Sequence, residues 1–294
     1  MSQPMFEMPT FGIGIAGNFA GHLQQTGEEK GLQGSVDTQS PQALFPFYVA
    51  GASDAYLNVN PYSFDVLMLP TDPSAKVQME PEIALIAKIK YLGMSVLGFK
   101  AEGMTLFNDA THRNAVVDKL AQKKNWGAAS KGIASKVIPL ADFNKNADLD
   151  KYRFCSFLGR NEQWKLCCSD VSLGDYSYSY EQLIAWLVSQ SNAQKNEGAL
   201  HSIQELLGQA GYPERILISL GSSRYTPFGE CHQLGAKDKV CAVLYDSTRI
   251  DVDEIQSFVE RGEVQKLKRN HVVLWQECQQ SSSLGQSEYL ERLI

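Results

Sequence analysis

The apolar positions of this chain fall mainly in short alternating or continuous runs, a pattern typical of β-strands. These runs predict strands at residues 12–16, 83–89, 104–107, 152–158, 164–167, 216–220 and 240–245. Apolar residues at helical spacing predict helices within 111–126, 180–190, 201–210 and 251–269. Residues 279–287 are low-complexity, and we expect them to be mobile. Strands therefore outnumber helices.

Two acids stand at the start of one of these runs. Glu80 and Glu82 flank Pro81, so on a strand their side chains point to the same face. Pro81 lacks an N–H and suits an edge strand or a strand start. Like charges this close repel each other unless a divalent cation or a basic side chain lies between them.

A third acid follows the strand predicted at 104–107, in the pair Asn108-Asp109. Glu80, Glu82 and Asp109 together offer three hard oxygen ligands, which suit Mg²⁺, Mn²⁺ or Ca²⁺ better than zinc. The alternative is that they are solvated acids at strand ends. Exposed acids are abundant, so spacing alone favours this second interpretation.

Three other polar segments are candidates for binding or catalysis. The strand at 12–16 leads to Asn18 and His22, and a loop of small residues surrounds Lys131. The strand at 216–220 runs into a loop with Ser222 and Arg224, whose donors could bind a carboxylate. An ordinary histidine, a solvated lysine and a plain turn are the respective alternatives. Residues 12–17 also match the spacing of the dinucleotide-binding glycines, but no full strand precedes them, so we reject that interpretation.

Composition excludes several classes of function. The net charge is −6 and no basic run is interleaved with aromatics, so we expect no nucleic-acid partner. No apolar run approaches the roughly 20 residues of a membrane span, and no signal peptide is visible. The six cysteines include no C-x-x-C pair, so we expect reduced thiols, no structural zinc and a cytoplasmic location.

Taken in order, these segments resemble motifs of the fumarylacetoacetate hydrolase superfamily over roughly residues 12–245. Residues 17–22 are similar to its glycine–asparagine–histidine segment, and 80–86 to its metal-binding strand. Asn108-Asp109 and Lys131-Gly132 are similar to the next two motifs. Residues 180–185 and 216–222 are similar to a later helix and to a strand with its loop.

The resemblance implies a β-rich α+β fold, with a rolled mixed sheet, peripheral helices and a homodimer. It implies Mg²⁺ or Mn²⁺, or else Ca²⁺, held by Glu80, Glu82 and Asp109. The predicted reaction is hydrolysis of a C–C bond in acylpyruvate-like 2-oxo or 2,4-dioxo acids, through a metal-stabilised enolate. His22 is then the general base and Lys131 offsets the charge of the substrate. Three residues are predicted to bind substrate: Asn18, Ser222 and Arg224.

The chain departs from the family pattern at Gln25, where several members have a glutamate that pairs with the histidine. Glu28 or Glu29 could replace it. Decarboxylation or isomerisation of the same substrates stays an alternative, as does a non-catalytic relative that binds small acids or acts in interactions. We divide the chain into an N-terminal segment at 1–70, a catalytic core at 71–250 and a C-terminal extension at 251–294.

Overall fold

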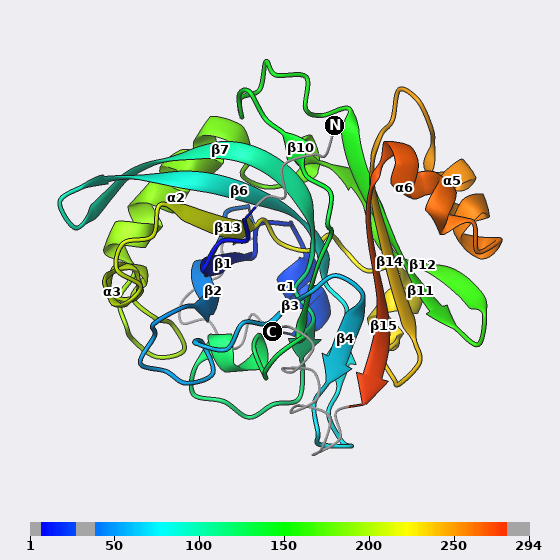
Figure 1. The fold of residues 1–294 in the computed structure, drawn as a ribbon, viewed down its shortest axis with the longest axis horizontal. Coiled ribbons are helices and arrows are strands. Elements are labelled where there is room, and N and C mark those ends of the chain that lie inside the picture. Colours follow the sequence, from blue (N-terminus) through cyan, green and yellow to red (C-terminus); the bar gives the residue numbers. More distant parts are fainter. Residues whose placement is uncertain (1–6, 28–38, 281–294) are drawn as a thin grey trace.

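A long antiparallel hairpin lies at the centre of the fold in the computed structural model, which describes residues 7–27 and 39–280. Its strands, β6 (Pro81–Leu92) and β7 (Ser95–Asn108), belong to an eight-stranded mixed sheet that curls around an apolar interior (Figure 1). The other strands of this sheet are β1 (Phe11–Ala16), β2 (Ala43–Val49), β3 (Tyr62–Ser63), β9 (Lys131–Ile133), β10 (Ile138–Pro139) and β13 (Arg215–Ser219).

A second, five-stranded sheet stands beside the curled one (Figure 1). Its order is β12, β11, β14, β15, β4, with the last pair parallel. These strands are β4 (Val66–Leu69), β11 (Tyr152–Arg160), β12 (Gln163–Ser172), β14 (Lys239–Asp246) and β15 (Val272–Gln280). Two short strands, β5 (Val77–Gln78) and β8 (Thr111–His112), form a separate pair.

The helices are α1 (His22–Thr26), α2 (Tyr180–Ala193), α3 (Ile203–Gln209), α4 (Pro227–Cys231), α5 (Val252–Glu260), α6 (Val264–Asn270) and the 3₁₀ turns η2 (Leu120–Lys123) and η3 (Leu173–Asp175). Figure 1 shows α2 and α3 outside the curled sheet, and α5 and α6 on the outer face of the second sheet. Within residues 7–27 and 39–280, none of the helices combines the length and the hydrophobicity of a membrane span.

Close aromatic packing fills the interior of the curled sheet. Phe47 stacks on Phe107 with ring centroids 4.8 Å apart. A Cβ on Gly12 or Gly14 would lie about 2 Å from the rings of Phe47 and Phe45, respectively. These glycines of β1 therefore make room for aromatic rings, in agreement with the rejection of a dinucleotide site.

The structure confirms the β-rich α+β fold and most of the predicted elements, although the helix predicted within 251–269 is divided into α5 and α6. The helix predicted within 111–126 is wrong, because only η2 is helical there and Val116 is fully exposed. Hydrogen bonds hold this segment as an extended loop, including one from Lys76 N to the side chain of Asn114. Strands also lie where none was predicted. β9 begins at Lys131, in the segment predicted as a loop. β15 includes residues 279–280 of the low-complexity segment, whose remainder lies outside the described residues.

The second sheet takes β4 from residues 1–70, β11, β12 and β14 from 71–250, and β15 from 251–294. The division of the chain into three parts stays a prediction. All six cysteines are free thiols.

Candidate active site

The start of β6 and the end of β7 bring the three predicted acids together. Pro81 pairs with Asn108, which places Glu80 next to Asp109 just beyond the paired strands. The Asn108 side chain accepts a hydrogen bond from Glu80 N, and Asp109 N donates to Glu80 O, both at 2.9 Å. Pro81 is a strand start rather than part of an edge strand, because β6 lies between β13 and β7.

Glu80, Glu82 and Asp109 form a buried carboxylate cluster. One carboxylate oxygen from each lies within 4.8 Å of the others, and no residue of the three is more than 3% exposed. The interpretation as solvated surface acids is therefore wrong. Burying three like charges is costly unless cations compensate them.

Two basic residues that the sequence analysis did not single out provide part of this compensation. Lys124 Nζ donates to Glu80 Oε2, Asp109 Oδ2 and the Thr111 hydroxyl, each at 2.7 Å. Arg113 Nη2 donates to Glu80 Oε1 at 2.6 Å. Neither residue belongs to a local motif that could have identified it.

Lys131 lies on the other side of Asp109. Its ammonium donates to Ala110 O at 2.5 Å and forms an ion pair with Asp109 Oδ1 at 2.8 Å. Burial lowers the pKa of Lys131 to about 8, against the opposing effect of Asp109. Lys131 is completely buried and does not line the cavity described below, so its predicted role toward a substrate stays a prediction.

Glu82 is held by the strand next to β6. Its Oε2 accepts hydrogen bonds from the Ser219 hydroxyl, at the end of β13, and from Gly221 N at 2.8 Å. Burial, with the charges of Asp109 and Glu80, raises the pKa of Glu82 well above its ordinary value.

The pKa of Glu80 is shifted in the opposite direction to that of Glu82. Burial alone would raise its pKa, but Arg113, Lys124 and His22 outweigh burial and hold the pKa well below the ordinary range. The cluster thus contains one firmly ionised carboxylate and one carboxyl group that favours its proton. Such a separation of neighbouring acids is a feature of functional sites.

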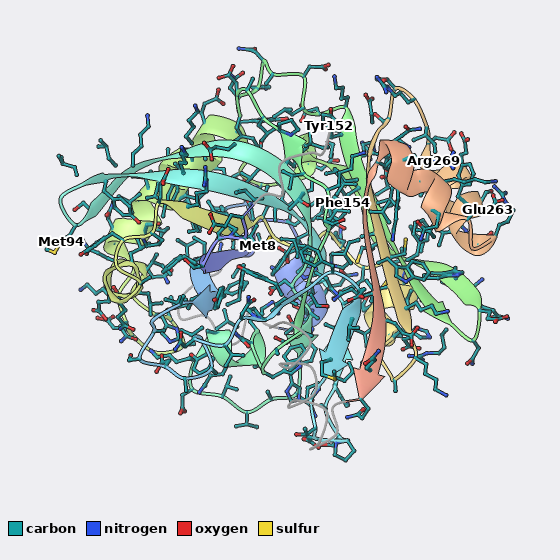
Figure 2. All side chains as sticks on the ribbon, viewed as in Figure 1. Met8, Met94, Tyr152, Phe154, Glu263 and Arg269 are labelled. Carbon is teal, nitrogen blue, oxygen red and sulfur yellow. The ribbon has the colours of Figure 1, made fainter. Side chains whose placement is uncertain are left out.

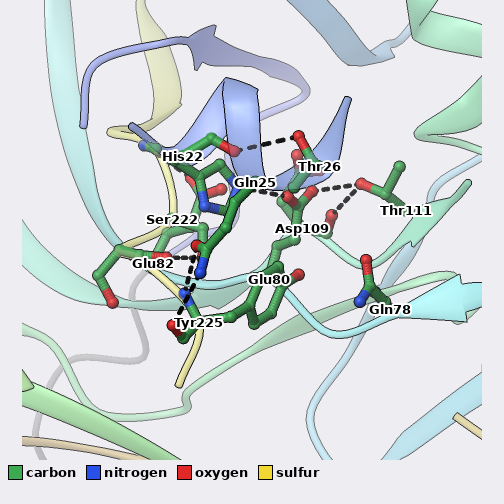
Figure 3. Close-up of polar contacts among 12 residues, drawn as sticks. His22, Gln25, Thr26, Gln78, Glu80, Glu82, Asp109, Thr111, Ser222 and Tyr225 are labelled. Carbon is green, nitrogen blue, oxygen red and sulfur yellow. Dashed lines mark hydrogen bonds and ion pairs between the residues drawn. The ribbon is translucent and has the colours of Figure 1, made fainter. Parts of the chain in front are cut away.

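His22, on α1, contacts the cluster through Glu80. Its Nε2 lies 2.9 Å from Glu80 Oε1, while Nδ1 is buried without a hydrogen-bond partner (Figure 3). With a carboxylate as acceptor, Nε2 carries the proton and Nδ1 has the free lone pair. Glu80 is therefore the carboxylate partner of His22. In the family pattern this partner is a glutamate at the position of Gln25.

Gln25, which replaces that glutamate, has a structural contact. Its side chain accepts from Tyr225 N and donates to Tyr225 O, at 2.9 and 3.0 Å, and also donates to Glu230 (Figure 3). Glu28 and Glu29, the proposed replacements, lie outside the described residues.

A small cavity opens on the cluster. It has a volume of about 20 Å³, and its wall includes His22, Phe45, Glu80, Glu82, Lys124 and Ser222. This volume suits one water molecule rather than an organic acid. None of the described residues at 246–280 contributes to the wall, so the described C-terminal extension does not fill the cavity.

The three predicted substrate-binding residues are placed differently from one another. Asn18 and Ser222 are buried and line the cavity. The Asn18 side chain donates to Leu220 O and accepts from Tyr178 N, so it also connects loops. Arg224 is exposed and does not line the cavity. Their roles in binding stay predictions.

The carboxylate cluster fits a divalent cation. Its donors are hard oxygens, and one oxygen from each of the three buried carboxylates lies within 4.8 Å of the others. Glu80, Glu82 and Asp109 are the residues that could hold the ion. Lys124 donates hydrogen bonds to two of these carboxylates, those of Glu80 and Asp109.

Comparison with known protein families shows to which family this chain belongs. Residues 33–278 match the family described as "Family of unknown function (DUF5718)". The chain belongs to this family. No curated protein matches the sequence. The matched region of the DUF5718 family includes the whole carboxylate cluster but not His22, which precedes it.

Solved structures resemble this DUF5718 chain in fold. "Cg1458 with inhibitor" has a TM-score of 0.54 and 15% identity, covering 93% of this chain and 78% of that chain. The 2-keto-3-deoxy-D-arabinonate dehydratase complexed with magnesium and 2,5-dioxopentanoate has a TM-score of 0.52 and 14% identity, covering 94% and 74%. Maleylpyruvate hydrolase from Sphingobium sp. SYK-6 has a TM-score of 0.50 and 11% identity, covering 93% and 72%. The likeness confirms the fumarylacetoacetate hydrolase fold that the motifs predicted.

Proposed function

We propose that this protein is a divalent-metal-dependent enzyme that hydrolyses a C–C bond in small 2-oxo or 2,4-dioxo acids of the acylpyruvate type. The observation that carries the proposal is the buried cluster of Glu80, Glu82 and Asp109, with His22 bonded to it at the wall of a cavity. Enzymes of the same fold act on 2-oxo acids, and one was solved with magnesium, which supports Mg²⁺ or the similar Mn²⁺.

When bound, the cation supplies Lewis-acid stabilisation of negative charge on a keto oxygen. The other steps belong to the chain. Glu80 orients the imidazole of His22, and Nδ1 takes the proton from water or from the substrate carbon.

A substrate screen tests the proposal. Metal-stripped protein is loaded with Mg²⁺ or Mn²⁺ and incubated with a series of acylpyruvates, and pyruvate release is measured. The expected result is metal-dependent release of pyruvate that Glu82→Ala abolishes. Loss of CO₂ without pyruvate would assign a decarboxylase, and an isomer of unchanged mass an isomerase. No metal binding and no turnover would contradict the proposal.

A non-catalytic relative that binds a small acid is the second candidate. The observation that favours it is the cavity of about 20 Å³, which has no room for a five-carbon acid without side-chain movement. Calorimetry with oxalate and pyruvate, read together with the substrate screen, separates the two, since this candidate predicts acid binding without any turnover.

A further inference from the structure

Lys124 is held in the carboxylate cluster more firmly than a surface lysine could be. Its ammonium makes three hydrogen bonds and lies 4.7 Å from the centre of the Phe45 ring. The side chain is only 5% exposed. A lysine in this setting acts as a fixed counter-ion for the acids around it.

The backbone on both sides of Lys124 is anchored. Lys124 N and Asn125 N donate to Ala121 O at 2.9 and 3.2 Å, and the Asn125 side chain donates to Phe47 O at 2.8 Å. Any change in the position of the ammonium therefore comes from rotation of the Lys124 side chain itself, which has four flexible carbon–carbon bonds.

Two acids of the site, Glu80 and Asp109, are compensated without a metal ion. Lys124, Lys131 and Arg113 place three positive charges within 2.8 Å of these two carboxylates. Lys124 is the cation that bonds two of the carboxylates at once, at Glu80 Oε2 and Asp109 Oδ2. A divalent ion held by these carboxylates would meet a positive charge at hydrogen-bond distance from its own ligands, where repulsion is strongest.

We propose that Lys124 is a built-in competitor of the metal: its ammonium occupies the cation position between Glu80 and Asp109, and a divalent ion binds there only when the side chain rotates out. This inference rests on the metal site of the proposed function and adds a control on its occupancy. Because Lys124 also lines the cavity, its departure enlarges the space of about 20 Å³. The same rotation of Lys124 then frees the metal site and opens space for a substrate.

Calorimetric titration of Mn²⁺ into metal-stripped protein tests the competition. Lys124→Met keeps an unbranched apolar stem against Phe45 and removes the ammonium. We expect this variant to bind Mn²⁺ at least tenfold more tightly than the wild type. Lys123→Met, the same charge change at the neighbouring residue outside the cavity, should bind as the wild type does.

Lys131→Met separates competition from a general effect of charge. It removes a buried ammonium that pairs with the same Asp109, but one that pairs with a single carboxylate of the cluster instead of two. Competition predicts a smaller gain in affinity for Lys131→Met than for Lys124→Met. Equal gains, or no gain in Lys124→Met while the wild type binds Mn²⁺, overturn the inference and leave the metal site standing. No binding in any variant overturns the metal site as well.

A measurement on the wild type keeps the inference testable if Lys124→Met does not fold. Brief acetylation of lysines, followed by peptide mass spectrometry, reports the exposure of each ammonium. Saturating Mn²⁺ should accelerate acetylation of Lys124 at least fivefold and leave that of Lys123 unchanged. Unchanged protection of Lys124 in the Mn²⁺-loaded protein overturns the inference.

Discussion

The two ends of the β6–β7 hairpin reverse the usual distribution of polar and apolar residues. At one end, Glu80 and Asp109 are buried to 2% and 0% exposure. At the other, Leu92 and Met94 are 72% and 67% exposed, and Figure 2 shows Met94 at the extreme tip, far from the second sheet. One pair of strands thus carries buried charge at one end and exposed apolar surface at the other.

The difference shows what each end depends on. The acids stay buried only because ammonium, guanidinium, hydroxyl and backbone groups from distant segments surround them. The tip residues lie beside a tight turn and depend on pairing within the hairpin. Substitutions at the acidic end should therefore lower the free energy of unfolding strongly, and their effects should not be additive. Substitutions at the tip should have small effects that are independent of one another.

Asp109→Ala should have the largest effect. It leaves Lys124 and Lys131 buried without their shared carboxylate, so we expect a loss of about 3–5 kcal/mol in the free energy of unfolding. Urea unfolding of metal-free protein measures it. Asp109→Asn, which keeps the shape and loses the charge, is the matched variant. A loss below about 1 kcal/mol for Asp109→Ala would show that solvent already reaches the cluster.

His22→Gln should affect the reaction more than the fold. Removal of a general base typically costs a factor of about 10² to 10⁴ in rate. We expect a fall of that size in kcat on any substrate that the screen identifies, with Mn²⁺ affinity within threefold of the wild type. His232→Gln, at a histidine that stacks on Phe228 away from the cavity, is the control. Full activity in His22→Gln would exclude this residue as the base.

Glu82→Gln should change the pH dependence of stability. The pKa of folded Glu82 is raised, so above the ordinary value of 4.5 the folded state binds more protons than the unfolded state. Stability of the metal-free wild type therefore falls as pH rises above that value. Glu82→Gln removes this penalty and should be about 1–3 kcal/mol more stable than wild type at pH 8, with the advantage vanishing near pH 4. If the free energy of unfolding by urea depended on pH in the same way in Glu82→Gln and in the wild type, Glu82 would not be protonated in the folded state.

Leu92→Gln with Met94→Gln at the tip should have the smallest effect. Exposed positions usually contribute within about 0.5 kcal/mol, so unfolding and Mn²⁺ affinity should stay as in the wild type. The same variant informs the predicted homodimer: we expect a dimer by sedimentation equilibrium in both proteins. Dissociation of the variant alone would place the tip in the interface.

The sequence by itself identified the three acids at one end of the hairpin, although spacing alone favoured their being solvated. Glu80 and Glu82 share a face because strand side chains alternate, and Asn108-Asp109 ends the next strand, so local periodicity was enough to nominate three acids. The same local reasoning failed at 111–126, where apolar spacing suggested a helix. There, hydrogen bonds to distant backbone hold an extended loop, and tertiary contacts override propensity.

Only the tertiary structure decided which groups neutralise those acids. Nothing local distinguishes Lys124 from Lys123, yet one ammonium lies between Glu80 and Asp109 and the other does not. Likewise, the fold gives His22 a partner in Glu80 and uses Gln25 to hold Tyr225. The physical reason lies in the range of the two effects. The direction of a strand side chain is set by its position in a two-residue repeat, which the local sequence shows. The cations that neutralise a buried acid come from any segment that the fold brings to about 3 Å from its carboxylate.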